Sequence, residues 1–325
     1  MSTSDAVRQV ERMMVTVLDG TQMRRLHDAL MECFIEQTIE RRKRLSNTDL
    51  LDAFLDAKRL EGCSRRSLKY YRSTLVTFID SLDGSLTLVT TEHIRTYLGR
   101  YGDKNNAGNV TIDNVRRIIS SFFSWLEAED YIYKSPARRI KRIRTVKTVK
   151  EIYSDEMIEL MRDGCTTKRD LAIVDLLAST GIRVGELVNL DRDDIDFESR
   201  ECVVLGKGGK ERRVYFDART KLHLLEYLET RTDDNRALFV SLSSPYRRLM
   251  ISGVEIRLRE LGRRLGVCRV HPHKFRRTLA TRAIDKGMPI EQVQVLLGHQ
   301  KIDTTLRYAM VDQRNVRMSH RKYIA

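Results

Sequence analysis

Apolar residues recur every three or four positions through most of this chain, and this periodicity limits its fold more than any other feature. Over residues 46–126 the spacing predicts a compact helical domain, and from residue 153 onward it predicts mostly helices again. Only residues 195–216 alternate, as short strands do, with a glycine-rich turn at 206–209. The sequence therefore predicts a mainly α protein with a small antiparallel β-sheet in its second domain.

Breaks in this pattern suggest how the chain is divided. At roughly 150 residues per domain, a chain of 325 residues predicts two domains with an additional segment. Residues 1–45 are interpreted as an N-terminal helical extension, with a helix capped by Thr21; arm-site binding, oligomerisation and regulation all stay open as its role. Residues 46–137 form the first domain, residues 138–152 a strongly basic linker, and residues 153–325 the second domain with a C-terminal tail.

The composition indicates a polyanionic partner. With 59 Lys and Arg against 45 Asp and Glu, the chain has a formal net charge of +14, which points to nucleic acid or to an anionic membrane surface. No apolar run approaches the roughly 18 residues that span a bilayer, and the first residues lack the apolar stretch of a secretory signal. The five cysteines are scattered without a Cys-x-x-Cys pair, so we expect no metal site, no disulfide framework and a reducing cytoplasm.

Several fragments of the second domain carry side chains suited to phosphate chemistry, although each alone has an ordinary structural explanation. Arg183 and Glu186 lie three residues apart on one helical face, as many surface ion pairs do. Lys207 lies in a Gly-Lys-Gly-Gly turn, where it either reaches into a groove or only serves the turn. His273 and Arg276 share a face near the start of a helix, which suits an oxyanion but equally a capping His beside a surface Arg.

Two further fragments lie nearer the C-terminus. His299 follows Gly298, which is expected to end a helix that begins at Pro289. A lone His in such a place is usually structural. Asp303 is expected to cap a helix that carries Tyr308, where a single Tyr is ordinarily a core or rim residue.

Taken together and in this order, the fragments resemble the tyrosine recombinase (phage integrase) family, and most of all its Xer-like and mobile-element members. The resemblance covers about residues 45–325, including the Ser-Pro-Ala-Arg-Arg start of the linker. The chain departs from the pattern at Arg277, where relatives often carry a second His that is outside the catalytic set. The residues that match the catalytic pattern are Arg183, Lys207, His273, Arg276, His299 and Tyr308, with Glu186 at the acidic position after the first Arg.

The resemblance implies a two-domain, C-shaped DNA clamp in which a helical core-binding domain precedes the catalytic domain. It also implies a site-specific recombinase that cuts and rejoins DNA without a metal, ATP or another cofactor. A tyrosine oxygen attacks a backbone phosphate, forms a 3′-phosphotyrosyl bond and releases a 5′-hydroxyl. A 5′-hydroxyl of another duplex then attacks that bond, by way of a Holliday junction. Such covalent catalysis divides one exchange into two transfers.

By the same resemblance, Tyr308 is the expected nucleophile, with His273 as general base or donor beside it. Lys207 is expected to protonate the leaving 5′-oxygen, and His299 to hydrogen-bond the phosphate. The guanidinium groups of Arg183 and Arg276 are expected to bind the nonbridging oxygens of the phosphate, because they match these oxygens in forked geometry and stay charged throughout. Glu186 is expected to hold Arg183 in place.

The expected partner is double-stranded DNA at recombination sites. Contacts of Lys and Arg with phosphates give an affinity that depends on salt, whereas helices in the major groove read the bases. The resemblance also implies a homo-tetramer on DNA that exchanges C-terminal tails, here residues 311–325, with accessory directionality or host factors as further partners. The expected location is the cytoplasm, at the nucleoid. The basic residues expected to contact DNA are Arg138, Arg139, Lys141, Arg142, Arg144 and Arg277.

Integration and excision of a mobile genetic element is the favoured role, because the added N-terminal segment suits an integrase. Xer-type resolution of chromosome or plasmid dimers uses the same chemistry and stays open. A non-catalytic DNA-binding protein on the same scaffold and a relaxing enzyme of the type IB topoisomerase kind are the remaining alternatives.

Overall fold

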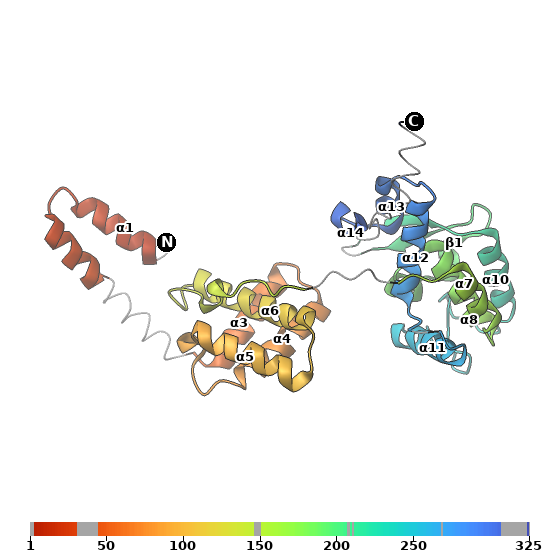
Figure 1. The fold of residues 1–325 in the computed structure, drawn as a ribbon, viewed down its shortest axis with the longest axis horizontal. Coiled ribbons are helices and arrows are strands. Elements are labelled where there is room, and N and C mark those ends of the chain that lie inside the picture. The colour runs from red at the N-terminus through yellow and green to blue at the C-terminus, as the bar shows by residue number, and fades with distance from the viewer. Residues whose placement is uncertain are drawn as a thin grey trace. The chain divides into compact units, whose positions relative to one another are not determined.

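The computed structural model divides the chain into two compact units, residues 1–147 and 148–325 (Figure 1). Each unit has a hydrophobic core of its own. No helix among the described residues is long and apolar enough to cross a membrane. The structure describes residues 3–30, 45–145, 151–206, 209, 211–267, 269–306 and 324.

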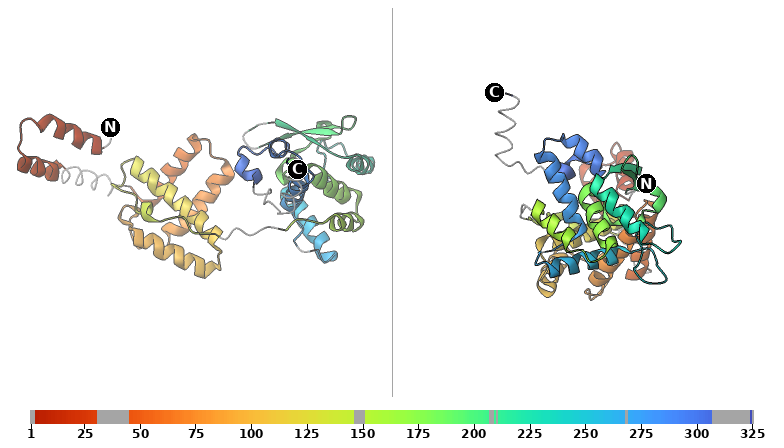
Figure 2. Two further views of the ribbon diagram at one scale, coloured as in Figure 1. Left: turned by 45° about the horizontal axis from the view of Figure 1, so that its top comes forward. Right: turned by 90° about the vertical axis from the view of Figure 1, so that its right-hand side faces the viewer.

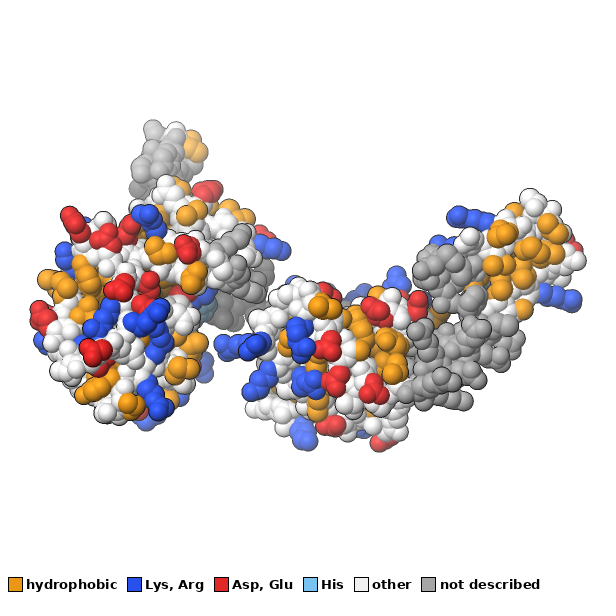
Figure 3. Space-filling view, turned by 180° about the vertical axis from the view of Figure 1, so that it is seen from behind, with side chains coloured by type: hydrophobic (Ala, Val, Ile, Leu, Met, Phe, Trp, Pro, Cys, Tyr) orange, Lys and Arg blue, Asp and Glu red, His pale blue; other side chains and the backbone are white. Residues whose placement is uncertain are grey.

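Two helices at the start of the chain form a pair, α1 (Thr3–Met14) and a helix over residues 20–30. The cap of the second helix is Asp19, whose carboxylate accepts hydrogen bonds from the backbone N–H groups of Thr21 and Gln22. The prediction of Thr21 as the cap was therefore wrong by two residues, because the Asp19 carboxylate accepts from two of the free amide groups of the first turn. Hydrophobic side chains gather on the face of these helices seen in Figure 3.

The remainder of the first unit is helical, as the apolar spacing predicts. Ser46 and Asp49 cap the first helix reciprocally, each side chain accepting from the other's backbone N–H. Phe54 is fully buried, and the Trp125 ring lies against it with centroids 5.6 Å apart. The aromatic side chains here therefore form a core. The elements are α3 (Asn47–Leu60), α4 (Arg65–Ile79), η1 (Leu86–Leu88), α5 (Thr91–Asn105), α6 (Asn109–Ala128) and η2 (Pro136–Arg139).

The basic segment that begins at residue 138 is attached to α6. The Asp113 carboxylate accepts a hydrogen bond from the Ile143 N–H at 3.0 Å, and the Asn109 amide donates to the Arg144 carbonyl at 3.0 Å. Ile140 packs against the core of the unit. Residues 138–144 are thus part of the first unit's hydrogen-bond network.

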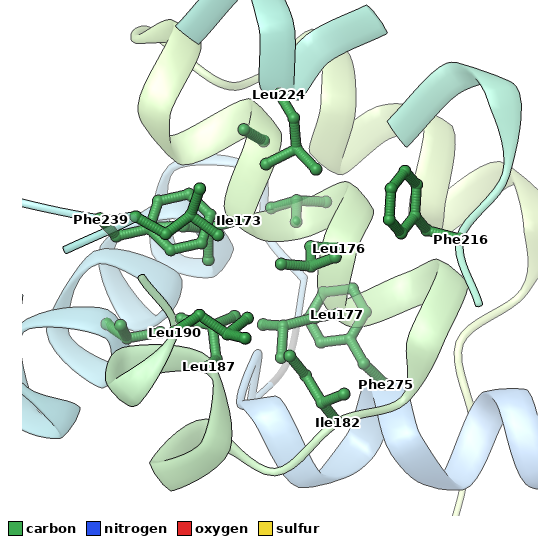
Figure 4. Packing of buried hydrophobic residues seen from close by; sticks show 14 of the residues in the cluster. Ile173, Leu176, Leu177, Ile182, Leu187, Leu190, Phe216, Leu224, Phe239 and Phe275 are labelled. Carbon is green, nitrogen blue, oxygen red and sulfur yellow. The ribbon is translucent and has the colours of Figure 1, made fainter. Parts of the chain in front are cut away.

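The second unit is built around α8 (Lys168–Thr180), which packs against α7, α10 and α12. Figures 1 and 2 show these helices on several sides of α8. Figure 4 shows buried apolar side chains of the core that surrounds α8, among them Ile173 of α8, Leu224 of α10 and Phe275 of α12. The other elements are α7 (Asp155–Asp163), α9 (Val184–Asn189), η3 (Arg192–Asp194), β1 (Ile195–Asp196), β2 (Glu201–Leu205), β3 (Glu211–Tyr215), α10 (Ala218–Glu229), α11 (Ile251–Arg264), α12 (Pro272–Asp285), α13 (Ile290–Leu297) and α14 (Ile302–Leu306).

The sheet has three antiparallel strands in the order β1-β2-β3. Cys202 pairs with Val214, and Val204 pairs with Arg212. Cys202, Val204 and Val214 are buried. Because side chains alternate along a strand, Arg212 lies on the inner side of β3 with Val214. The small antiparallel sheet within a mainly helical chain confirms the predicted fold class.

Candidate active site

A tight turn between α8 and α9 positions the first Arg of the predicted site. Gly181 ends α8 with φ of +60°, and a Cβ atom there would lie 2.7 Å from the Leu279 side chain of α12. Glycine is thus required by both the backbone conformation and the close approach of α12. Ile182 is fully buried, and Arg183 then precedes the first residue of α9.

Glu186 lies buried beneath this arginine and binds two guanidinium groups. Its carboxylate accepts from Arg183 Nη1 at 2.7 Å and from the Arg183 backbone N–H at 2.8 Å. Arg212 of β3 donates to both carboxylate oxygens, at 2.8 and 2.7 Å. Burial disfavours the charged carboxylate, but the hydrogen bonds from Arg212 and Arg183 outweigh it and hold the pKa of Glu186 below its usual range. The predicted contact between Arg183 and Glu186 is present.

The other predicted arginine lies on α12, which begins at Pro272 as expected. Arg276 is only 1% exposed, and its guanidinium donates to the Gly181 carbonyl at 2.9 Å and to the Leu297 carbonyl. His273 lies one turn earlier on the same helix and is exposed. The turn after α8 and the end of α13 therefore both hold Arg276 in place.

Three arginines bind three consecutive carbonyl groups at the C-terminal end of α13. Besides the Arg276 contact with Leu297, Arg212 Nε donates to the Leu296 carbonyl at 3.2 Å, and Arg183 Nη2 donates to the Gly298 carbonyl at 3.3 Å. The last carbonyls of a helix lack partners within the helix and carry the negative end of its dipole. The carbonyl groups at the end of α13 thus form an anchor of partial negative charge for the three guanidinium groups.

His299 directly follows this anchor. Its Nδ1 lies 2.8 Å from the hydroxyl of Thr305 on α14, which is fully buried. Burial, followed by the positive charges of Arg276, Arg183 and Arg212, lowers the pKa of His299 to about 4. The imidazole is consequently neutral at neutral pH, with its ring orientation set by Thr305.

A cleft of about 560 Å³ opens beside these groups and is lined by Arg183, His273 and Arg276. Glu255 and Arg259 of α11 line it as well. Two guanidinium groups at one cleft can bind the oxygens of a phosphate with forked, charge-assisted hydrogen bonds. The structure thus brings together the predicted Arg, His and Arg of widely separated segments.

The structure does not describe all of the predicted residues. Lys207 and Tyr308 are not among the described residues. Asp303 is the second residue of α14 and not the residue before it, so the prediction that it caps the helix was wrong. Arg277 donates to the carbonyl of Glu151 at 3.0 Å. The basic residues Arg138, Arg139, Lys141, Arg142 and Arg144 are exposed in the first unit.

Family models and curated relatives match most of the chain. The phage integrase family matches residues 148–315, and the phage integrase N-terminal SAM-like domain matches residues 50–132. The chain belongs to the phage integrase family. Tyrosine recombinase XerC of Staphylococcus aureus strain USA300 / TCH1516 is 32% identical over 281 residues, which cover 82% of this chain and 93% of that protein. XerC of strain MSSA476 is 31% identical over the same shares. The chain is a tyrosine recombinase, a DNA strand transferase.

Solved structures share the fold of this recombinase. A lambda integrase dimer bound to a COC′ core site has a TM-score of 0.69 at 19% identity, with 90% of this chain and 86% of that chain covered. The Tn1549 transposon integrase in complex with transposon right end DNA has a TM-score of 0.70 at 19% identity, with 85% and 99% covered.

Several residues at the site of this recombinase could not be identified from the sequence. Neither Arg212 of β3 nor Thr305 of α14 was singled out as a functional residue from the sequence. No sequence motif marks Glu255 and Arg259. They lie on α11, outside the His-x-x-Arg fragment, and only the tertiary packing of that helix brings them to the cleft. Strand alternation did contain a signal for Arg212, since it places this side chain on the same face as buried Val214.

Proposed function

We propose that this recombinase cuts and rejoins double-stranded DNA at specific sites through a 3′-phosphotyrosyl bond formed by Tyr308. The observation that carries the proposal is the cleft of about 560 Å³ that Arg183, His273 and Arg276 line together. In this assignment the scissile phosphate binds at the two guanidinium groups, with Tyr308 and Lys207 supplied by the segments that follow α14 and β2.

The two arginines neutralise the negative charge that develops on the nonbridging oxygens. Glu186 and the Gly298 carbonyl hold Arg183, and the carbonyls of Gly181 and Leu297 hold Arg276. Because these contacts exist before DNA binds, little reorganisation is needed when the charge develops. By analogy with the loss of an oxyanion-hole donor, removing either guanidinium lowers the cleavage rate by roughly 10²–10³-fold.

Proton transfer is assigned to the remaining residues. A tyrosine has a pKa near ~10 in water, so Tyr308 is mostly protonated at neutral pH and needs a base, for which we propose His273. Lys207 protonates the leaving 5′-oxygen. His299, with a pKa of about 4, stays neutral and donates a hydrogen bond to the phosphate.

Formation of the covalent adduct tests this assignment. Full-length protein selects bound sequences from a random duplex pool, and those duplexes are then nicked beside each candidate phosphate to trap the intermediate. We expect a detergent-resistant protein–DNA adduct at the 3′ end, its loss in Tyr308→Phe, and its retention in the control Tyr323→Phe. An adduct in Tyr308→Phe would refute the role of Tyr308. Tight, salt-sensitive binding without any adduct would instead support a non-catalytic DNA-binding protein.

DNA holding is assigned to both units. The exposed cations Arg138, Arg139, Lys141, Arg142 and Arg144 bind phosphates, and each unit contacts the duplex. Acidic and basic side chains are intermixed on the faces of both units seen in Figure 3, which show no large surface of one charge among the described residues. The proposed DNA contacts are therefore assigned to the basic cluster at residues 138–144. The active assembly is a homo-tetramer that exchanges the tails of residues 311–325, in the cytoplasm at the nucleoid. One solved relative is titled as a lambda integrase tetramer bound to a Holliday junction.

The favoured biological role is integration and excision of a mobile element. Resolution of chromosome or plasmid dimers is the second candidate, supported by the 32% identity to XerC over 82% of the chain. Exchange between two unlike sites indicates integration, whereas exchange restricted to identical sites indicates dimer resolution. Deletion of residues 1–44 tests the role of that segment further. If the shortened protein no longer exchanges long sites but still exchanges minimal sites, the segment binds accessory DNA.

A further inference from the structure

Arg212 of β3 contacts parts of the site that lie far apart along the chain. Its side chain is 11% exposed, and Glu186 beneath it is 5% exposed. Three of its N–H groups are used, two by the Glu186 carboxylate and one by the Leu296 carbonyl. Arg212 thus joins the sheet to α9 and to the end of α13.

The contact with Glu186 reaches Arg183 directly. Both guanidiniums bind Glu186 Oε1, Arg212 at 2.8 Å and Arg183 at 2.7 Å. Two cations held this close repel each other unless the carboxylate between them stays charged and fixed. The Arg212 fork fixes both oxygens of Glu186, and so it sets the direction in which Glu186 accepts from Arg183.

The contact with α13 reaches His299. Gly298 packs on the Arg212 side chain so closely that a Cβ atom there would lie 2.8 Å from Arg212 Cδ. The Gly298 carbonyl binds Arg183, and His299 is the next residue. Arg212 therefore supports the same turn that carries both a ligand of Arg183 and the predicted phosphate donor.

We infer that Arg212 is a positioning residue for DNA cleavage, which holds Arg183 through Glu186 and His299 through the end of α13. This inference rests on the proposed function, because it requires that Arg183 bind the scissile phosphate. A lysine at position 212 keeps the positive charge but offers a single ammonium group, which cannot bridge both Glu186 oxygens and the Leu296 carbonyl.

The test compares Arg212→Lys with Arg213→Lys. Arg213 is the neighbouring residue on the outer face of the same strand, where it is 66% exposed and pairs with Glu201 at 2.6 Å. By analogy with residues that orient metal ligands, we expect Arg212→Lys to lower the single-turnover cleavage rate by about 10–100-fold. We expect DNA affinity and the circular-dichroism spectrum to be unchanged, and Arg213→Lys to cleave like the wild type.

A double-mutant cycle shows whether Arg212 acts through Arg183. If it does, Arg212→Lys lowers the rate by a smaller factor in an Arg183→Lys background than in the wild type, because one of the two groups that it positions is already lost. Wild-type cleavage by Arg212→Lys, or an equal loss in both backgrounds, overturns the inference. Failure of the wild type to cleave overturns the proposed function instead. If Arg212→Lys melts below the assay temperature, the cycle is run at a lower temperature at which it is folded.

Discussion

The hydroxyl of Tyr153 accepts a hydrogen bond from the backbone N–H of His271 at 3.1 Å. Tyr153 is fully buried at the start of the second unit, and its backbone N–H donates to the hydroxyl of Thr278 at 3.0 Å. Tyr153, near the start of the second unit, is thus hydrogen-bonded both to the residue that precedes α12 and to a residue within it. Helix α12 carries His273 and Arg276. The first residues of the second unit and the proposed phosphate site are therefore both attached to this helix.

Tyr153→Phe removes the hydroxyl and keeps the ring that packs against Phe275. The His271 N–H then loses its acceptor, and we expect the free energy of unfolding to fall by about 1–2 kcal/mol. Urea denaturation of the two proteins measures the difference. Tyr215→Phe, at a position that is 55% exposed, is the matched control and should leave the unfolding midpoint unchanged. An equal effect of the two substitutions would contradict the structural role of the Tyr153 hydroxyl.

His299 should make stability depend on pH. Its pKa is lowered from 6.5 to about 4 in the folded protein, so between these values the unfolded chain binds the proton more readily. The stabilisation from a neutral His299 is therefore complete above pH ~6.5 and is lost as the pH falls toward ~4. We expect the urea midpoint of the wild type to fall more steeply over this window than that of His299→Gln. If the urea midpoints of the two proteins change with pH in parallel, the pKa of His299 is not lowered by burial and the nearby arginines.

The helical spacing and cap residues predicted much of the site's local structure. Pro272 starts α12, Gly298 ends α13, and the three-residue spacing of Arg183 and Glu186 produces a direct ion pair. These features depend on residues close in sequence, where backbone conformation and side-chain type are sufficient.

The long-range contacts of the site could not be predicted in the same way. Arg212 lies 26 residues from Glu186 and 84 from Leu296. Its second ligand is a backbone carbonyl, a group that every residue has, so no residue type marks it. Alternation along β3 places Arg212 on the buried face, and a buried Arg requires an anionic or carbonyl partner. That rule predicts that partners exist but does not identify them.

Asp113 attaches the basic segment after η2 to α6. Its carboxylate accepts from Ile143 N–H at 3.0 Å and from Arg116 at 2.7 Å. Asp113→Ala removes the acceptor, and because one hydrogen bond is worth about 1 kcal/mol, amide exchange at Ile143 should be roughly fivefold faster. Hydrogen exchange followed by mass spectrometry measures this. Asp103→Ala, at an exposed position on α5, serves as the control, and unchanged protection in Asp113→Ala would contradict the contact.

Gly298→Ala tests the close packing between the end of α13 and Arg212. Gly298 has φ of +64° and Gly266 has φ of +65°, so alanine at either site costs about 1–2 kcal/mol in backbone strain. A Cβ atom at 298 would also lie 2.8 Å from Arg212 Cδ, whereas at 266 no heavy atom of the described residues lies within 4 Å. We therefore expect Gly298→Ala to lower both the free energy of unfolding and the cleavage rate further than Gly266→Ala does. Because the backbone strain is matched, the excess loss of cleavage measures disturbance of this turn, which contacts both Arg212 and Arg183, and equal losses would show that the turn tolerates the added methyl group.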